Sequence, residues 1–387
     1  MKPATANTPL LLLFFAMLGA CNTSQLPGHT GLKEFEEYDQ DRLFDTTSKE
    51  LGQKFRPVKF EIYYPSFCST PDSSVTFGDF LDMYDRRFNF NRSRDSSRKS
   101  SFDFARIIGE ALKIDAPEKL LNVATGIYKD LPLPQKKYPL IIYAAGMNGG
   151  SWENSILFDS LAKAGYVVAA VYSVGKYPGY MTDPVDLDEQ VRDIMFVKRK
   201  MKSMPFIDHS KIGLLSWSMG GSAATKAAML SNDFKCLLSF DGTEIHYYGR
   251  DSSWDRQFDE IKTIPPFIPE RISIPYMYLS SSRNWKNDSV YIFPQHIHSE
   301  EKFYLEMKGA EHESFSSLFP IAKAAQPGVV INDSNHHERV PALTRTFFNQ
   351  YLLNRKDVST RDTISKMTST EPGLFSIEYP AQKYSEK

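Results

Sequence analysis

From residue 138 onward, the chain alternates short apolar runs with longer stretches in which apolar residues recur at helical spacing. The runs PLIIYAA (139–145) and YVVAAVY (166–172) are apolar throughout, as expected of strands that are buried on both faces of a sheet. Similar runs predict strands at 211–217, 235–240, 274–280 and 302–307, and the helical stretches lie at 151–165, 183–201, 220–230 and 341–353. This alternation predicts an α/β fold with a mostly parallel, doubly wound sheet and helices on both faces.

The N-terminal half is less regular. Residues 57–65, PVKFEIYYP, alternate apolar and charged positions and predict a strand. Residues 66–104 are rich in Ser, Asp, Arg and Asn, and we expect a loop insertion with a short helix at 77–88, followed by a helix at 104–113. We therefore predict one domain over 55–355, a polar tether before it and a C-terminal extension over 356–387 whose order the pattern leaves open.

The first residues have the pattern of a secretory signal. Lys2 precedes the nine-residue apolar run LLLLFFAML (10–18), which is too short to span a bilayer. It ends in LGAC (18–21), which resembles a bacterial lipobox. The resemblance implies a signal peptide over 1–20, acyl chains on Cys21, a tether over 21–54 and a lipid-anchored protein of the bacterial envelope, in a leaflet left open. An ordinary signal peptide with an incidental cysteine is the alternative.

Composition and charge narrow the classes of function. With 46 basic and 47 acidic residues the net charge is −1, so the charge of the chain does not indicate a nucleic-acid-binding surface. The basic cluster NRSRDSSRKS (91–100) is expected to be a solvated loop. After Cys21 only Cys68 and Cys236 remain, too few for a disulfide framework, and Cys236 reads as a buried free thiol unless the two pair.

Candidate chemistry lies just past the predicted strands, where open α/β sheets bind ligands. Ser218 follows 211–217 within GLLSWSMGGSAA (213–224), Asp241 follows 235–240, and His312 follows 302–307 after the residues KGAE. A serine needs an adjacent base to become a nucleophile, and an acid holds the histidine in the required tautomer. The chain order of serine, acid and histidine is that of α/β hydrolases. We expect Ser218, Asp241 and His312 to form a catalytic triad.

The oxyanion of such a reaction requires backbone donors. The N–H of Met219, directly after the serine, is one candidate, and the N–H of Met147, after Gly146, is the other. Asp288 is the alternative acid. HIH (296–298) is an alternative metal site, but no Cys/His spacing indicates zinc, and we expect no metal and no cofactor. The remaining histidines, which we assign to loops, are His29, His209, His246, His336 and His337.

Several segments together resemble bacterial relatives of platelet-activating-factor acetylhydrolase, within the dienelactone-hydrolase-like α/β hydrolases. They are RPVKFEIYYP, YPLIIYAAGMNGG, DEQVRDIMFVKRKM, IDHSKIGLLSWSMGG, CLLSFDG and KGAEHESF, in the order seen in that family. The resemblance covers 55–355 and implies the α/β-hydrolase fold, ester hydrolysis without metal or cofactor, and an acid at Asp241. The chain departs from the family at Ala145, where a histidine is common, and at Ser216, where glycine is usual.

The substrate class stays open at the level of sequence. Loops at 66–104, 174–184 and 243–258 are candidate pocket walls, with Tyr177, Tyr180, Tyr247, Tyr248 and Trp254 as aromatic lining. They suit a small-molecule, lipid or carbohydrate ester, or simple loop packing. An amide hydrolase with the same triad and a non-catalytic binding protein are the rival functions. The membrane is expected as a partner only through the anchor, and the oligomeric state is left open.

Overall fold

A computed structural model describes most of the chain. The described residues are 28–44, 54–68, 73–176, 181, 186–245, 252–263, 265, 267–281, 293–331, 336–373 and 375–377. The predicted signal peptide, Cys21, Asp288 and four of the five loop aromatics (Tyr177, Tyr180, Tyr247 and Tyr248) lie outside these ranges, and the fifth, Trp254, belongs to a helix at 252–263. Within the described ranges, no helix is both long and apolar enough to cross a membrane.

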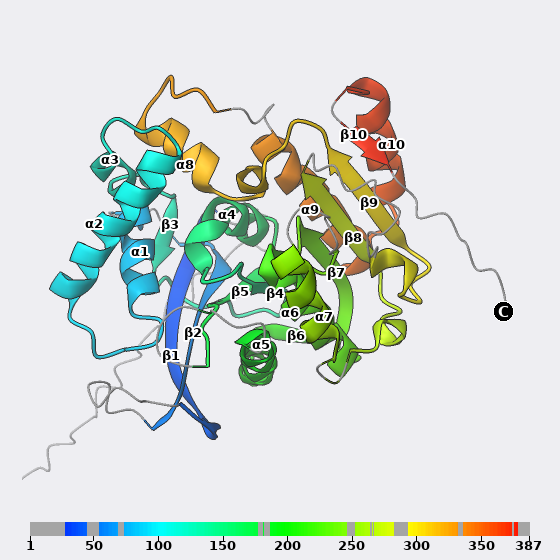
Figure 1. The fold of residues 1–387 in the computed structure, drawn as a ribbon, viewed down its shortest axis with the longest axis horizontal. Helices are drawn as coiled ribbons and strands as arrows, with labels where there is room; N and C mark the ends of the chain where they lie inside the picture. The colour runs from blue at the N-terminus through cyan, green and yellow to red at the C-terminus, as the bar shows by residue number, and fades with distance from the viewer. Residues whose placement is uncertain are drawn as a thin grey trace, which may run out of the picture.

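The core of the fold is a ten-stranded sheet in the order β10-β9-β8-β7-β6-β4-β5-β2-β1-β3 (Figure 1). Its six central strands are parallel to one another. They are β4 (Tyr138–Ala144), β5 (Val167–Val171), β6 (Ile207–Trp217), β7 (Phe234–Phe240), β8 (Tyr276–Ser281) and β9 (Lys302–Met307). These strands confirm the parallel, doubly wound sheet expected from the apolar runs.

Two hydrophobic cores lie on opposite faces of this sheet, because successive side chains of a strand point to opposite sides. In β4, Ile141 and Tyr143 enter one core, and Leu140 and Ile142 enter the other. The first face is covered by α4 (Ser155–Lys163), α8 (Leu318–Ala325) and α9 (His336–Tyr351), and the second by α5 (Asp186–Lys202), α6 (Met219–Leu230) and α7 (Ser252–Thr263). Short 3-10 turns complete the chain at η1 (Ser151–Glu153), η2 (Pro269–Arg271), η3 (Phe293–Gln295) and η4 (His312–Phe315).

The prediction of a polar tether over 21–54 is partly wrong. Residues 29–43 form β1 (His29–Leu43), a 15-residue strand that pairs antiparallel with β2 (Phe55–Ser66) and parallel with β3 (Ile127–Lys129). Its charged side chains form ion pairs: Glu34 and Glu36, for example, bind the buried Lys59 of β2 at 2.8 and 3.0 Å. Because such ion pairs satisfy the charged side chains of β1, its sequence does not show the apolar run of a central strand.

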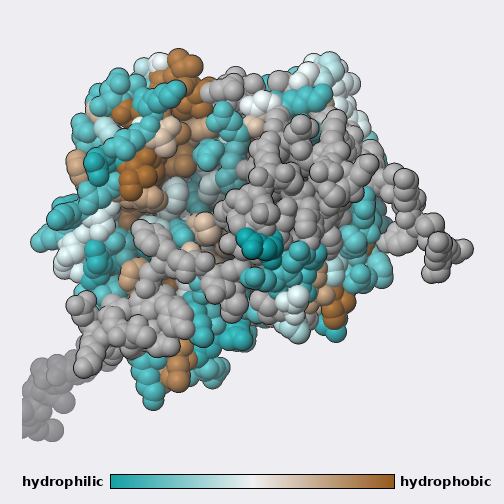
Figure 2. Space-filling view, viewed as in Figure 1, coloured by the Kyte–Doolittle hydropathy of each residue, from teal (hydrophilic) through white to brown (hydrophobic). Residues whose placement is uncertain are grey.

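The insertion after β2 is more helical than expected. Helix α1 (Phe77–Asp85) confirms the short helix, but α2 (Arg94–Ala111) begins ten residues before the predicted start. The side chain of Ser93 caps α2 by accepting the N–H of Ser96, so the basic cluster of 91–100 is largely helical and not a loop. With α3 (Glu118–Leu121), these helices gather at one end of the sheet (Figure 1). Figure 2 shows hydrophobic residues over this end, where Phe102 and Ile107 of α2 are exposed.

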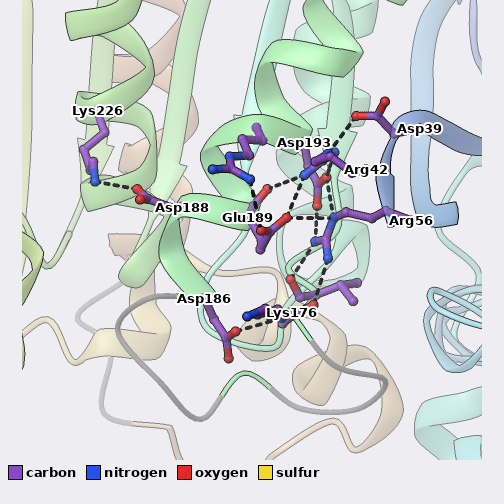
Figure 3. A network of polar contacts seen from close by, with 12 residues as sticks. Asp39, Arg42, Arg56, Lys176, Asp186, Asp188, Glu189, Asp193 and Lys226 are labelled. Carbon is purple, nitrogen blue, oxygen red and sulfur yellow. Dashed lines mark hydrogen bonds and ion pairs between the residues drawn. The ribbon is translucent and has the colours of Figure 1, made fainter. Parts of the chain in front are cut away.

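A buried polar network ties the β1–β2 ribbon to α5 (Figure 3). Arg56 is 1% exposed, and its guanidinium binds Asp193 at 2.6 and 2.9 Å and the carbonyls of Val174 and Gly175 at 2.9 and 2.8 Å. Arg42 also binds Asp193, at the Oδ1 that Arg56 Nε contacts. The network holds Val174 and Gly175, which begin the 174–184 loop that the sequence predicted as a wall of the substrate pocket.

The C-terminal extension docks in part on the domain. Helix α10 (Thr360–Thr370) precedes β10 (Phe375–Ile377), which extends the sheet by pairing antiparallel with β9. Cys68 and Cys236 are both free thiols, and Cys236 is buried, so the pairing left open by the sequence is not formed.

Candidate active site

Ser218 stands on a sharp turn between β6 and α6. Its backbone angles, φ 55° and ψ −128°, are strained for a non-glycine residue. The turn is fixed from β7, because the N–H of Ser218 donates to the carbonyl of Phe240 (3.0 Å) and the N–H of Thr243 donates to the carbonyl of Ser218 (3.0 Å). Ser218 is half-buried between fully buried neighbours. The turn therefore lifts one hydroxyl out of the core.

The glycine of the serine motif is dictated by packing. A methyl group at Gly220 would lie 2.1 Å from the carbonyl oxygen of Ala144 and 2.7 Å from that of Ala145. Only glycine lets the first turn of α6 approach the end of β4 this closely. Ser216, in place of the usual first glycine, is fully buried, and its small side chain fits against β7 near the carbonyl of Leu238.

Asp241 and His312 meet at the carboxyl edge of the sheet. Nδ1 of His312 lies 2.6 Å from Oδ2 of Asp241, and Asp241 is 2% exposed. Asp241 follows β7 in the left-handed conformation, with φ 43°. Ser281, at the end of β8, donates its N–H (3.0 Å) and its hydroxyl (2.9 Å) to the same carboxylate. The carboxylate is thus held by β8 while it faces the imidazole.

His312 begins η4, and it also rests on the residue before the serine. The imidazole stacks on the indole of Trp217 with the ring centroids 4.8 Å apart and an angle of 25° between the planes. Trp217 Nε1–H donates to the carbonyl of His312 at 3.2 Å. The histidine is therefore fixed on one side by Asp241 and on the other by the strand that carries Ser218.

The loop after β4 lies against the serine. A methyl group at Gly146 would be 3.3 Å from Cβ of Ser218, so the backbone of this loop borders the hydroxyl. The side chain of Met147 is 44% exposed, whereas Met219 is buried. Met219 is the first residue of α6, so its N–H has no acceptor inside the helix. The role of these two N–H groups as oxyanion donors stays a prediction.

Two buried carboxyl groups support the site from behind. Glu153 lies under the loop after β4, and burial raises its pKa to about 8. Glu244 packs against Gly221 and Gly242, accepts the hydroxyl of Tyr276 at 2.9 Å, and has its pKa raised to about 7 by burial. Neither carboxyl group was predicted from the sequence to belong to the site. The only available signal was a lone carboxylate beside a Gly-rich loop.

The structure brings Asp241 and His312 together and places Trp217, Gly146 and Met219 around Ser218. The alternative acid Asp288 lies outside the described residues. Among the residues that are described, no group of three His, Cys, Asp or Glu side chains is arranged to hold a metal ion, and this includes His296 and His298. Trp217, Ser281 and Glu153 are site residues that the sequence did not indicate.

No protein-family model and no curated protein matches the sequence. The ferulic acid esterase of Streptomyces cinnamoneus superposes with a TM-score of 0.58 at 16% identity, over 87% of this chain and 93% of that one. The chain has the α/β-hydrolase fold. An acylaminoacyl peptidase of Pyrococcus horikoshii matches at a TM-score of 0.42 and 19% identity, over 56% of this chain and 38% of that one.

Proposed function

We propose that the protein is a serine hydrolase that cleaves a carboxylic ester through an acyl-enzyme intermediate. The observation that carries this proposal is the contact of 2.6 Å between Asp241 and His312, whose imidazole stacks on Trp217, directly before a serine on a strained strand-to-helix turn. Backbone strain of this kind at a half-buried serine clusters at functional sites.

The chemistry follows from the positions of these groups. The Oγ of Ser218 attacks the ester carbonyl while Nε2 of His312 takes the hydroxyl proton. The tetrahedral oxyanion accepts the N–H groups of Met219 and Met147. His312 returns the proton to the departing alcohol, which leaves the acyl group on Ser218. Water, deprotonated by His312, then releases the carboxylic acid and restores the serine.

Asp241 holds the imidazole with Nδ1–H toward the carboxylate, so that Nε2 is free to act as the base. The two donors from Ser281 keep the carboxylate of Asp241 in the plane that this contact requires. This arrangement, with the acid after the strand that follows the serine, is the one found in the acetylhydrolase-like family that the sequence resembles.

The substrate we propose is a small-molecule, lipid or carbohydrate ester. A buried aromatic cluster packs behind the loop after β4: Phe104 and Trp152 lie edge to face at 5.2 Å, and Tyr84 stacks on Phe104 at 5.5 Å. The hydroxyl of Tyr84 donates to the carbonyl of Asn148 in that loop at 2.5 Å. The cluster therefore holds the loop in place, and the class of ester is proposed from the family that the sequence resembles.

We also propose that acyl chains on Cys21 anchor the enzyme in the bacterial envelope. The basis is the sequence LGAC after an apolar run of nine residues. Detergent-phase partitioning of the full-length protein and of Cys21→Ser tests this: the wild type is expected in the detergent phase and the variant in the aqueous phase. Equal partitioning would contradict the anchor.

The catalytic proposal is tested by assaying one preparation on p-nitrophenyl esters of increasing acyl length, a feruloyl ester and the matching anilides. We expect ester hydrolysis that falls at least 10³-fold in Ser218→Ala and His312→Gln, since loss of either triad member removes most of the acceleration. Faster anilide than ester turnover would favour the amide hydrolase. No turnover of either class by folded protein would favour the binding protein.

A further inference from the structure

The mechanism above leaves one buried ionisable side chain beside the reacting serine unused. Glu153 is 1% exposed, in η1 directly after the loop that follows β4. Its Oε2 accepts the N–H of Gly146 at 3.1 Å and the hydroxyl of Tyr143 at 2.9 Å. The carboxyl group therefore bridges the end of β4 and the first residue of the loop.

Glu153 and Ser218 both lie close to Gly146. A methyl group at Gly146 would be 3.1 Å from Oε1 of Glu153 and 3.3 Å from Cβ of Ser218. A methyl group at Gly149 would lie only 1.7 Å from the same Oε1. The loop thus folds over the carboxyl group, and its glycines are required for that contact.

The contacts of Glu153 belong to a set that fixes each part of the loop. Asn154 Nδ2 donates to the oxygen of the Tyr143 hydroxyl at 3.0 Å. The hydrogen of that hydroxyl therefore donates to Glu153. Before Gly146, the buried Gln190 of α5 donates to the carbonyl of Ala145 at 2.7 Å. After it, the N–H of Gly149 donates to the carbonyl of Gly146 at 2.9 Å. None of these contacts uses the N–H of Met147.

We propose that Glu153 is a positioning residue: by accepting the Gly146 N–H and the Tyr143 hydroxyl, it holds the peptide between Gly146 and Met147 so that the Met147 N–H faces the oxyanion. This inference rests on the proposed function. Since the Gly146 N–H points down to the carboxyl group, it is not available to substrate, and the next amide along the loop serves instead. The carboxyl group itself touches no reacting atom.

The charge state of Glu153 matters at this place, because an anion behind the loop would oppose a developing oxyanion. The ionisable groups that face the carboxyl are Tyr143 of β4 and, beyond it, Tyr63 of β2. Burial raises the pKa of both tyrosines well above the usual value, and both stay neutral. With its pKa raised to about 8 by burial, Glu153 is mostly uncharged at pH 7 and ionises as the pH rises through about 8.

The test compares Glu153→Gln with Glu153→Met on a p-nitrophenyl ester, with kcat and KM measured from pH 6 to pH 10. Gln keeps an acceptor oxygen, and we expect its kcat at pH 7 within about threefold of the wild type. Met keeps the size but not the acceptor, and we expect kcat to fall about 10²-fold with KM little changed, as after loss of an oxyanion donor. Glu61→Met is the matched control. Glu61 is also buried, with its pKa raised to about 7, but lies on β2, where it faces Lys59, Tyr172 and Ser151.

The pH profile supplies a readout that a purely structural role would not change. We expect the wild type to lose kcat above about pH 8, as Glu153 ionises, and Glu153→Gln to keep its plateau. If Glu153→Met does not fold, the pH dependence of kcat in Glu153→Gln and the wild type still tests the inference. Unchanged kcat in folded Glu153→Met, or an alkaline limb identical in wild type and Gln, would overturn the inference while wild-type turnover still supports the proposed function. Absence of wild-type turnover would overturn both.

Discussion

The indole of Trp217 stacks on the imidazole of His312 and donates its N–H to the carbonyl of the same residue. One side chain, adjacent to Ser218, therefore sets both the ring plane and the backbone position of the histidine. This contact joins η4, whose position depends on a loop, to a central strand of the sheet.

Replacing Trp217 by Phe keeps an aromatic ring under His312 but removes the hydrogen bond. We expect kcat to fall about tenfold, which corresponds to one hydrogen bond of about 1 to 1.5 kcal/mol. Trp152→Phe is the control, because Nε1 of Trp152 has no hydrogen-bond partner among the described residues. Steady-state kinetics on an ester substrate provides the comparison. Equal losses in the two variants would argue against the positioning of His312 by Trp217.

Ser281→Ala removes the hydroxyl that donates to both carboxylate oxygens of Asp241 at 2.9 Å. The backbone N–H remains, so we expect a partial loss of kcat, about tenfold, since a hydrogen bond to a charged group contributes roughly 1.5 to 3 kcal/mol. The neighbouring hydroxyl of Ser280 donates to the carbonyl of Ser281 instead, so Ser280→Ala should leave kcat within about twofold of the wild type. A Ser281→Ala variant as active as Ser280→Ala would show that Asp241 needs no support from β8.

Gly220→Ala would force a methyl group against two backbone carbonyls at the end of β4. Neither carbonyl can move without displacing the sheet, so we expect a loss of about 3 kcal/mol or more in the free energy of unfolding, together with loss of activity. Gly373→Ala serves as control, because nothing lies within 4 Å of the position that its methyl group would take. Urea unfolding of both variants measures the difference. A Gly220→Ala protein as stable as Gly373→Ala would mean that the turn is not as tight as the structure has it.

Burial also makes stability depend on pH. The pKa of Glu61 is raised from 4.5 to about 7, so the folded state binds a proton that the unfolded state releases above pH 4.5. Its contribution to stability is fully present below about pH 4.5 and is lost as the pH rises through about 7. At pH 5, Glu61→Gln should differ in stability from the wild type only through the packing of the new side chain. Between pH 5 and pH 8 it should lose less stability than the wild type, by an amount on the order of 1 to 3 kcal/mol.

Thermal and urea unfolding of Glu61→Gln and the wild type at pH 5 and pH 8 measures this difference in slope. The exposed Glu110→Gln, at the solvent-facing end of α2, is the control and should follow the wild type at both values. Parallel stability curves for Glu61→Gln and the wild type would contradict the raised pKa.

The sequence predicted the parts of the molecule whose signals are local. Strands β4 to β9 are buried on both faces and read as apolar runs, and Ser218, Asp241 and His312 follow three of them. Strand β1 was not predicted because many of its side chains are charged and form ion pairs with neighbouring residues, so the strand has no apolar run. The predicted start of helix α2 lies too far along the chain, because most residues in the first two turns of the helix are charged or polar and face solvent.

The supporting residues of the site could not be predicted in the same way. Trp217 reads as the end of an apolar run, Ser281 as one of three consecutive serines, and Glu153 as part of a helix start. Their roles arise from contacts between segments far apart in the chain: Trp217 with His312, and Ser281 with Asp241. No local pattern encodes such a pairing, whereas the acid and the base are indicated by their positions at strand ends.

The central claim is that Ser218 is the nucleophile, and covalent labelling tests it most directly. Purified wild type and Ser218→Ala would be treated with a fluorophosphonate probe, and the adduct would be located by mass spectrometry. The account predicts one adduct, on Ser218, that is absent from the variant and much slower to form in His312→Gln. A folded wild-type protein that remains unlabelled, or one labelled equally in Ser218→Ala, would contradict it.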